Sequence, residues 1–203
     1  MKTLLSVGAL VAALLGPGLV PQAAADTARL EVATFAGGCF WCMQTPFEKI
    51  PGVHRTTVGY TGGSLQNPTY QQVSAGGTGH AEAVDVHFDP AKVKYTQLLD
   101  VFWHNIDPLA KDRQFCDVGD QYRTAIFTHG DEQRKAANQS LHTLDASGRF
   151  KSPIRTQIVD ATKFFPAEEY HQDYHRKNPG RYAFYRWNCG RDARLQELWG
   201  AAK

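Results

Sequence analysis

The chain has 203 residues, of which 42% are hydrophobic and 21% are charged, a composition typical of one folded domain with an ordinary core. Its 22 basic and 20 acidic residues nearly balance, so the charge gives no reason to expect nucleic acid or an anionic membrane as a partner. The four cysteines are too few for a disulfide-stapled scaffold, so redox and metal chemistry both have to be considered.

The first 25 residues have the organisation of a secretory signal peptide. Lys2 precedes an apolar run from Leu4 to Leu15, and Ala23-Ala24-Ala25 supplies the small residues of a cleavage site. The run is too short, and too soon interrupted by Pro17, to span a bilayer. We therefore expect cleavage near Ala25, export to the bacterial periplasm or secretion, and one mature domain over residues 26–203.

Strand and helix patterns alternate along the mature chain. The hydrophobic spacing predicts strands at residues 32–35, 53–60, 81–88, 122–128 and 154–159. It predicts helices at residues 40–49, 69–74, 95–105, 129–145, 167–177 and 190–199. The loops between them are many and rich in glycine. This alternation indicates an α+β or α/β fold, a mixed sheet with packed helices and extensive coil.

The stretch Gly37-Gly38-Cys39-Phe40-Trp41-Cys42 follows the first strand and begins the first helix. Two glycines let the backbone turn sharply and approach a ligand closely. Cys39 then lies near a helix N-terminus, where free N–H groups and the helix dipole stabilise a thiolate. Phe40 and Trp41 add an apolar surface beside it. The stretch predicts a nucleophilic sulfur next to a hydrophobic pocket, and the alternative is a buried structural cysteine.

Glu82 has the most informative position outside this motif. Residues two apart in a strand share a face, so Glu82 lies on the apolar face of Val84, Val86 and Phe88. Burial disfavours the ionised carboxylate and favours the neutral acid, which can donate a proton. The alternative is that Glu82, near the end of its strand, turns into solvent.

Three further side chains lie in polar surroundings where they can take part in chemistry. Tyr70 follows Pro68 and Thr69, and Tyr122 opens a strand after a polar loop. Phenol hydroxyls at such positions can hydrogen-bond a polar oxygen, although either ring could equally be a core residue with a solvated hydroxyl. Asp117, between Cys116 and Val118, either supports the site or caps a turn.

The remaining motifs concern thiols and histidines. Cys39 and Cys42 form a Cys-x-x-Cys, which suits a redox dithiol or half of a zinc site. His171 and His175 stand four apart on the helix predicted at 167–177, a spacing compatible with metal ligands. Two ligands fall short of the three or four that a metal site needs.

Together these motifs resemble those of the A-type peptide methionine sulfoxide reductases, which act on the S epimer of the sulfoxide. The resemblance covers residues 32–199 and is carried by six stretches: Gly38-Cys39-Phe40-Trp41-Cys42, Gly59-Tyr60-Thr61-Gly62-Gly63, Asn67-Pro68-Thr69-Tyr70, Gly79-His80-Ala81-Glu82-Ala83-Val84, Gln121-Tyr122-Arg123-Thr124-Ala125-Ile126 and Ala167-Glu168-Glu169-Tyr170-His171-Gln172-Asp173-Tyr174.

The resemblance implies a ferredoxin-like core and a role for each candidate residue. Cys39 matches the nucleophile that attacks the sulfoxide sulfur, and Glu82 matches the acid that protonates the oxygen. The other matches are Tyr70 and Tyr122 for the hydroxyls that hold this oxygen, Phe40 and Trp41 for the methyl pocket, and Asp117 for a site-lining carboxylate. Attack leaves a sulfenic acid on Cys39, which a second thiol converts to a disulfide and an external dithiol reduces.

The resolving thiol is open among three cysteines. Cys189 corresponds loosely to a tail cysteine of the family and is the first choice, although the tail lacks the family's Gly-rich run. Cys42 is local and comes second, and Cys116 is third. We expect no organic cofactor and no metal, only a thioredoxin or thioredoxin-like donor. The expected substrates are oxidised proteins and peptides and free methionine sulfoxide, with no nucleic acid, no stable membrane association and a monomeric chain.

Two other functions compete with the reductase. A thioredoxin-like dithiol oxidoreductase would use Cys39 and Cys42, but that fold usually has a Trp before the first cysteine and a cis-proline loop. An exported metal-binding module would use cysteines together with His171 and His175. Reduction of insulin disulfides without sulfoxide turnover would favour the first, and stoichiometric zinc or copper the second.

Overall fold

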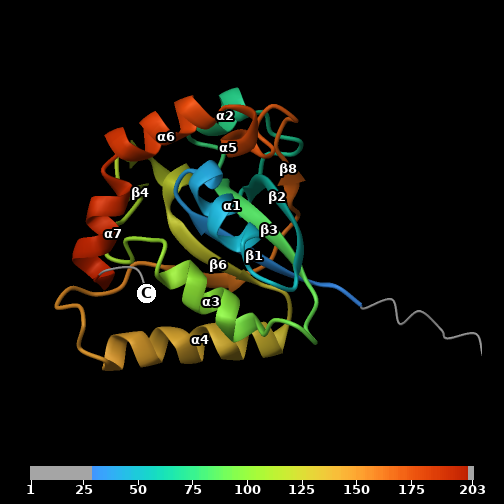
Figure 1. The fold of residues 1–203 in the computed structure, drawn as a ribbon. Helices are drawn as coiled ribbons and strands as arrows, with labels where there is room; N and C mark the ends of the chain where they lie inside the picture. Colours follow the sequence, from blue (N-terminus) through green and yellow to red (C-terminus); the bar gives the residue numbers. More distant parts are fainter. Residues whose placement is uncertain (1–28, 201–203) are drawn as a thin grey trace, which may run out of the picture.

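The computed structural model describes residues 29–200 and contains one mixed sheet of six strands (Figure 1). The strand order is β7-β6-β1-β3-β2-β8. Their bounds are β1 Glu31–Gly37, β2 Val53–Thr61, β3 Ala81–Phe88, β6 Thr124–Thr128, β7 Gln157–Asp160 and β8 Phe165–Pro166. Only β6 and β7 pair in parallel, and the other neighbours are antiparallel. A separate hairpin joins β4 (Arg113–Gln114) to β5 (Asp117–Val118).

Seven helices connect and flank the strands in the described part of the chain. They are α1 Phe40–Glu48, α2 Tyr70–Ser74, α3 Tyr95–Trp103, α4 Asp131–Ala146, α5 Tyr174–Lys177, α6 Pro179–Asn188 and α7 Arg191–Trp199, with a 3₁₀ turn at Asp120–Tyr122. The run β1-α1-β2-β3-α3-β6 with sheet order β6-β1-β3-β2 is the ferredoxin-like split βαβ arrangement. The predicted α+β class and ferredoxin-like core are confirmed.

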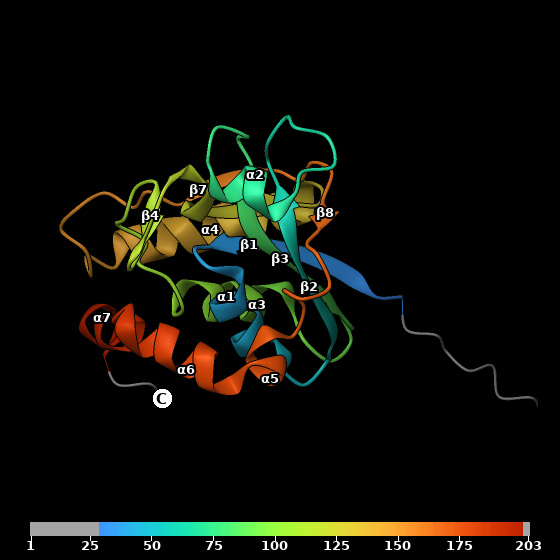
Figure 2. The ribbon, with the colours of Figure 1, turned by 90° about the horizontal axis from the view of Figure 1, so that it is seen from above.

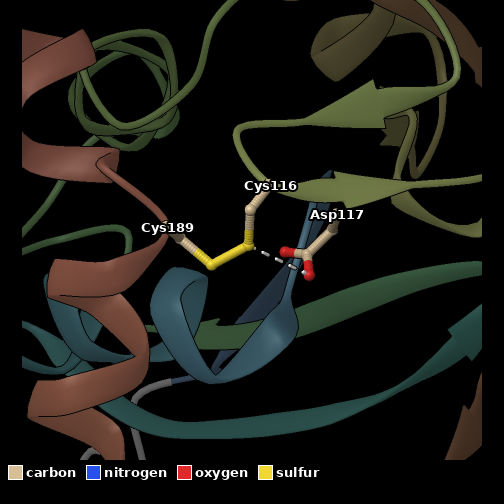
Figure 3. A group of neighbouring side chains, drawn as sticks. All are labelled: Cys116, Asp117 and Cys189. Carbon is tan, nitrogen blue, oxygen red and sulfur yellow. Dashed lines mark hydrogen bonds between the residues drawn. A yellow bond between two sulfur atoms is a disulfide. The ribbon is translucent and has the colours of Figure 1, made fainter.

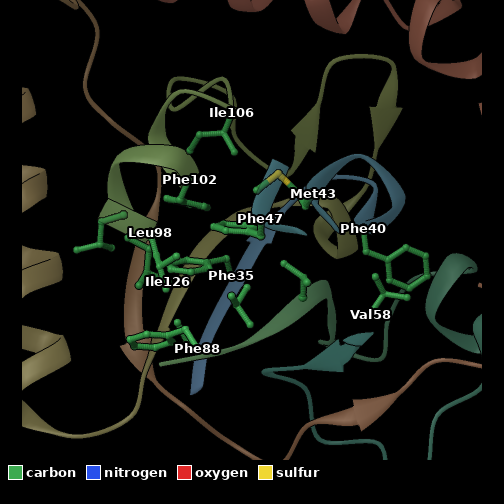
Figure 4. Close-up of a cluster of buried hydrophobic side chains, with 14 of the residues drawn as sticks. Phe35, Phe40, Met43, Phe47, Val58, Phe88, Leu98, Phe102, Ile106 and Ile126 are labelled. Atoms are coloured by element: carbon green, nitrogen blue, oxygen red, sulfur yellow. The ribbon is translucent and has the colours of Figure 1, made fainter. Parts of the chain in front are cut away.

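The main core lies between the sheet and helices α1, α3 and α4 (Figure 4). Alternation along β1 directs Ala33 and Phe35 into this core, where Phe35 stacks on Phe47 of α1 at 5.0 Å between ring centroids. The next residue, Ala36, belongs to a second, smaller cluster on the other face, which Phe164 helps to cover. Both faces of the central strands are therefore buried near the end of β1, where the catalytic motif begins.

The C-terminal helices are anchored to this region by one buried arginine. Figure 2 shows α6 and α7 along one side of the molecule, next to α1. Arg191, at the start of α7, is only 2% exposed and donates to the carbonyl oxygens of Gly37 (3.3 Å) and Asn105 (2.6 Å). Its guanidinium also contacts Met43 Sδ at 3.0 Å and lies over the Phe115 ring. This side chain joins the tail, the end of β1 and the β4–β5 hairpin.

The structure corrects the prediction of a continuous helix over residues 167–177. Phe165 and Pro166 instead pair with Tyr60 and Gly59 as an edge strand, an allowed position for proline because an edge strand can spare its missing N–H. Turns follow, and Asp173 adopts φ 53°, a left-handed conformation that a helix cannot continue through. Only α5 is helical there.

Four smaller differences concern other segments. Tyr122 ends the 3₁₀ turn rather than opening the strand, and β7 begins at Gln157 rather than at residue 154. Helix α6, with Pro179 at its first turn, was not predicted, because Asn178-Pro179-Gly180 indicates a break and not a helix start. The β4–β5 hairpin also lies within a segment predicted to be a loop.

The expected signal peptide and cleavage position lie outside the described residues. Within residues 29–200, none of the helices combines the length and apolarity needed to cross a membrane.

Candidate active site

Cys39 caps the N-terminus of α1, directly after the turn that ends β1. Gly38 makes this turn with φ 80°, and a Cβ at this position would lie 2.4 Å from Gln114 Cβ. Both the backbone angle and the close approach therefore require glycine. The thiol of Cys39 is nearly buried at 5% exposure, and Cys42 in the first turn of α1 is 1% exposed. Both cysteines are free thiols.

Glu82 is bound directly to the start of the same helix. Its Oε2 accepts a hydrogen bond of 3.1 Å from the Phe40 backbone N–H, one of the donors left free at a helix N-terminus. The side chain is 2% exposed, which confirms that it faces inward from β3. Burial raises the pKa of Glu82 from 4.5 to about 8, against the opposing effect of the Phe40 hydrogen bond. At neutral pH the group is a protonated acid beside Cys39.

The hydroxyls of Tyr70 and Tyr122 lie close enough to Glu82 and Cys39 for the charges of both groups to shift their pKa values. Burial raises the pKa of Tyr70 to about 12, and the charge of Glu82 adds to this shift. Burial and Glu82 also raise the pKa of Tyr122. Both hydroxyls therefore stay protonated and can donate hydrogen bonds across the physiological range. Tyr70 is held by Glu168, whose carboxylate accepts from the Tyr70 N–H (2.8 Å) and the Tyr60 hydroxyl (2.9 Å).

Aromatic rings enclose the position next to Cys39. Trp41 stacks on Tyr174 with 3.7 Å between ring centroids, and its indole N–H donates to His171 Nδ1 at 3.1 Å. Phe40 packs against His171 and Tyr60, with centroids 5.2 and 5.9 Å away. These contacts hold the rings of Phe40 and Trp41 in fixed positions next to Cys39. Their assignment to the methyl pocket stays a prediction.

The two thiols of the Cys39–Cys42 pair have pKa shifts in opposite directions. Burial raises the pKa of Cys39 well above its ordinary value, and the nearby carboxyls of Glu82 and Asp117 add to the shift. The pKa of Cys42 falls to about 6, because the Cys39 thiol donates a hydrogen bond to it and the Arg191 and Arg186 charges favour its thiolate. At Cys39 the pKa increase caused by desolvation is larger than the decrease expected from the helix N-terminus. The two thiols therefore titrate as one pair.

Asp117 joins the site through Tyr185, a residue of α6 that the sequence analysis did not single out. The Tyr185 hydroxyl donates a hydrogen bond to Asp117 Oδ2. Burial raises the pKa of Tyr185, and the nearby Cys39 and Asp117 groups add to the shift. Burial raises the pKa of Asp117, while the Tyr185 hydrogen bond and the Arg191 charge lower it. The sequence pattern does not identify Tyr185, because no helix is predicted over residues 179–188. Without that helix, the positions of Tyr185, Arg186 and Cys189 relative to the site cannot be inferred from their spacing.

The other two cysteines form a disulfide beside this site. Cys116, in the turn of the β4–β5 hairpin, is bonded to Cys189 at the C-terminus of α6 (Figure 3). Cys116 is exposed and Cys189 is half-buried. Of the three candidate resolving cysteines, Cys42 is a free thiol and acts directly on Cys39, whereas Cys116 and Cys189 are bonded to each other.

The two histidines do not form a metal pair. His171 accepts from Trp41, whereas His175 Nε2 lies 3.3 Å from Glu48. Because the left-handed backbone at Asp173 breaks the helix between them, His171 and His175 do not share a helix face and contact different residues. Among the described residues, the group of side chains placed to share a metal is Cys116, Asp117 and Cys189.

Comparison with known proteins places the chain in a family. The family profile "Peptide methionine sulfoxide reductase" matches residues 31–203. The chain belongs to this family. A relative from Bacillus licheniformis, "Peptide methionine sulfoxide reductase MsrA", is 54% identical over 170 residues, covering 84% of this chain and 94% of the relative. The activity of the family is the thiol-dependent reduction of methionine sulfoxide to methionine.

Other relatives extend this result. "Peptide methionine sulfoxide reductase MsrA/MsrB" from Vibrio cholerae is 46% identical, covering 99% of this chain but only 56% of that longer protein. The reduced form of Mxr1 from Saccharomyces cerevisiae has a TM-score of 0.70 at 31% identity, covering 76% of this chain and 89% of Mxr1. The mixed sheet with packed helices is thus shared with solved structures of the family.

The raised pKa of Glu82 allows a test of its proposed role as the acid that protonates the sulfoxide oxygen. Because the proton is lost as pH rises through about 8, we expect kcat/KM to fall above that pH. Glu82→Gln should lower kcat/KM by roughly 10²–10⁴-fold at pH 7 and abolish this pH dependence.

Folding stability provides the control for this variant. Since the folded chain binds the Glu82 proton more tightly than the unfolded chain, this group's contribution to stability declines from pH 4.5 to about 8. Glu82→Gln should therefore gain in Tm relative to wild type as pH rises through that window. A variant with full activity and an unchanged pH profile would exclude Glu82 as the proton donor.

Proposed function

We propose that the chain reduces the S epimer of methionine sulfoxide, in oxidised proteins and peptides and as the free amino acid, with Cys39 as nucleophile. The observation that carries this proposal is the Phe40 N–H···Glu82 hydrogen bond, which fixes a protonated carboxyl beside the nearly buried Cys39. A thiol and an acid held on one rigid helix start are what attack on sulfur and protonation of oxygen require.

In the first step Cys39 attacks the sulfoxide sulfur while its proton passes to the Cys42 thiolate. The attack forms a bond between the Cys39 sulfur and the substrate sulfur, and Glu82 gives its proton to the sulfoxide oxygen. The sulfur–oxygen bond then breaks, the hydroxide that leaves adds to Cys39, and the bond between the two sulfurs breaks with its electron pair returning to the substrate sulfur. The sulfoxide is reduced to the thioether, and Cys39 is oxidised to the sulfenic acid. Tyr70 and Tyr122 donate hydrogen bonds to the oxygen as its charge develops.

Selectivity follows from the aromatic cage. The walls formed by Phe40 and Trp41 accept the methyl group on sulfur, and the fixed donors on the opposite side accept the oxygen. Only one epimer presents methyl and oxygen to these two sides at once while the sulfur faces Cys39. We assign a positioning role to Asp117: it accepts the Tyr185 hydrogen bond and so fixes the Tyr185 ring on the side of the cage next to Cys39.

Cys42 is our choice for the resolving thiol, ahead of the sequence-based first choice, Cys189. The Cys42 sulfur already contacts Cys39, whereas Cys189 is bonded to Cys116. Condensation of Cys42 with the sulfenic acid forms the Cys39–Cys42 disulfide and releases water, with the proton of Cys42 leaving on the hydroxyl. Cys189 and Cys116, once reduced, pass electrons to this buried disulfide by thiol–disulfide exchange.

The electron donor is a thioredoxin or a thioredoxin-like domain, and no resident cofactor is needed. Reduction of a protein disulfide proceeds through a mixed disulfide, so the donor must reach a sulfur atom. Cys116 is the exposed sulfur of the site, which makes it the entry point. We propose that the chain works as a monomer and is exported after cleavage near Ala25.

The nucleophile and the epimer are tested by reaction of the reduced protein with separated S and R methionine sulfoxide in a peptide, without added reductant. We expect methionine from the S epimer only and none from Cys39→Ser, because the variant lacks the attacking sulfur. Turnover of both epimers would contradict the cage argument, and activity of Cys39→Ser would contradict the assignment of the nucleophile.

The resolving step is tested by counting methionine released per chain in the same assay. The fully reduced wild type should release about two equivalents, because both cysteine pairs supply electrons, and Cys116→Ser/Cys189→Ser only about one. Cys42→Ser should stop after one equivalent and accumulate a sulfenic acid on Cys39 that dimedone traps. Two equivalents from Cys42→Ser without a trapped sulfenic acid would restore Cys189 as the resolving thiol.

Export is tested by cell fractionation and N-terminal sequencing of the protein. A mature chain that begins at or near Asp26 in the exported fraction is expected, and a protein that retains Met1 would refute the proposal.

A further inference from the structure

Three side chains with metal-binding atoms converge beside the catalytic thiol. Cys116 comes from the β4–β5 turn, Asp117 from β5 and Cys189 from the end of α6 (Figure 3). One ligand atom from each lies within 4.8 Å of the other two. In the state described here the two sulfurs are joined, which leaves them without the thiolate charge that a metal needs.

Reduction changes the chemistry of this cluster. An external dithiol converts the Cys116–Cys189 bond to two thiols and is itself oxidised to a disulfide. Two thiols and a carboxylate, held by a hairpin and a helix end, then face one another. We propose that the reduced protein binds one Zn²⁺ through Cys116, Cys189 and Asp117, with release of the two thiol protons.

The ligand set suits zinc better than harder cations. Thiolates favour Zn²⁺ over Mg²⁺ or Ca²⁺, which take oxygen ligands. With Zn–S bonds of about 2.3 Å and tetrahedral angles, the two sulfurs stand roughly 3.7 Å apart. The backbone positions are compatible with this small opening, since Cys116 lies in an exposed turn and Cys189 precedes Gly190, which has φ 64°. Three protein ligands leave a fourth position for water.

The carboxylate is already oriented for this role. Tyr185 donates to Asp117 Oδ2, which leaves Oδ1 directed at the sulfur pair, 3.7 Å from Cys116 Sγ. Hydrogen bonds of this kind from neighbouring side chains are a regular feature of metal-ligating carboxylates. The Arg191 charge offsets part of the negative charge of the three ligands. Disulfide and metal are therefore mutually exclusive states of one pair, and the site exists only after reduction.

The proposal is tested in Cys39→Ser/Cys42→Ser, which removes the inner thiols as competing ligands. This variant is reduced with a phosphine, freed of it and titrated with Co²⁺, a spectroscopic probe for zinc sites, followed by displacement with Zn²⁺. We expect one equivalent of Co²⁺ with a thiolate-to-cobalt charge-transfer band. The same protein with its outer disulfide intact should show no such band. Absence of the band in the reduced protein, or an equal band in the oxidised one, would overturn the proposal.

Two tyrosines on α6 provide a matched pair of variants in the same background. Tyr185→Phe removes the hydrogen bond to Asp117 and should weaken Zn²⁺ binding by roughly 10–100-fold, the usual effect of losing a group that orients a ligand. Tyr182→Phe, whose hydroxyl contacts Thr45, should leave affinity unchanged. Equal affinities in the two variants would contradict Asp117 as a ligand. The test does not depend on the roles proposed for Cys39 and Cys42.

Discussion

The hydrogen bond from the Phe40 backbone to Glu82 is the contact on which the rest of the site depends. It joins the first free N–H of α1 to a carboxyl on β3, so the cysteine that caps the helix and the acid on the sheet cannot move independently. Burial at this junction has two effects. It keeps Glu82 protonated, and it keeps Cys39 a thiol rather than a thiolate. The same desolvation that keeps Glu82 protonated disfavours the Cys39 thiolate, while the pKa of Cys42, in the first turn of the same helix, is shifted in the opposite direction.

The charge of the thiol pair is balanced from the C-terminal tail. Arg191 is almost fully buried, and its hydrogen-bond acceptors are the neutral oxygens of Gly37 and Asn105. A buried guanidinium without a carboxylate contact of its own favours anions nearby, which here are Cys42 and Asp117. Arg191 follows Cys189 by two residues, so the same short segment carries the outer cysteine and the charge that lowers the pKa of Cys42.

The local hydrophobic pattern is sufficient to predict structure where the residues that decide it are close together in the sequence. The strand from Ala81 to Phe88 was predicted to the residue, and with it the inward direction of Glu82. The pattern was insufficient where a distant segment decides the structure. Phe165 and Pro166 become a strand only because β2 offers an edge, and Tyr185 and Glu168 matter only because of what they contact on other elements. The lowered pKa of Cys42 depends first on the hydrogen bond from Cys39 but also on the charge of Arg191, 149 residues beyond Cys42 in the chain.

The exposures of the four cysteines impose an order on electron flow. A nucleophile at 5% exposure is protected from reagents other than a small sulfoxide side chain, but for the same reason it is out of reach of a protein donor. Cys42 is even less exposed, so a disulfide between the two has no direct access to the donor. Cys116 is exposed and bonded to the half-buried Cys189. Burial of the inner pair therefore leaves Cys116 as the sulfur that a protein donor can reach from the surface.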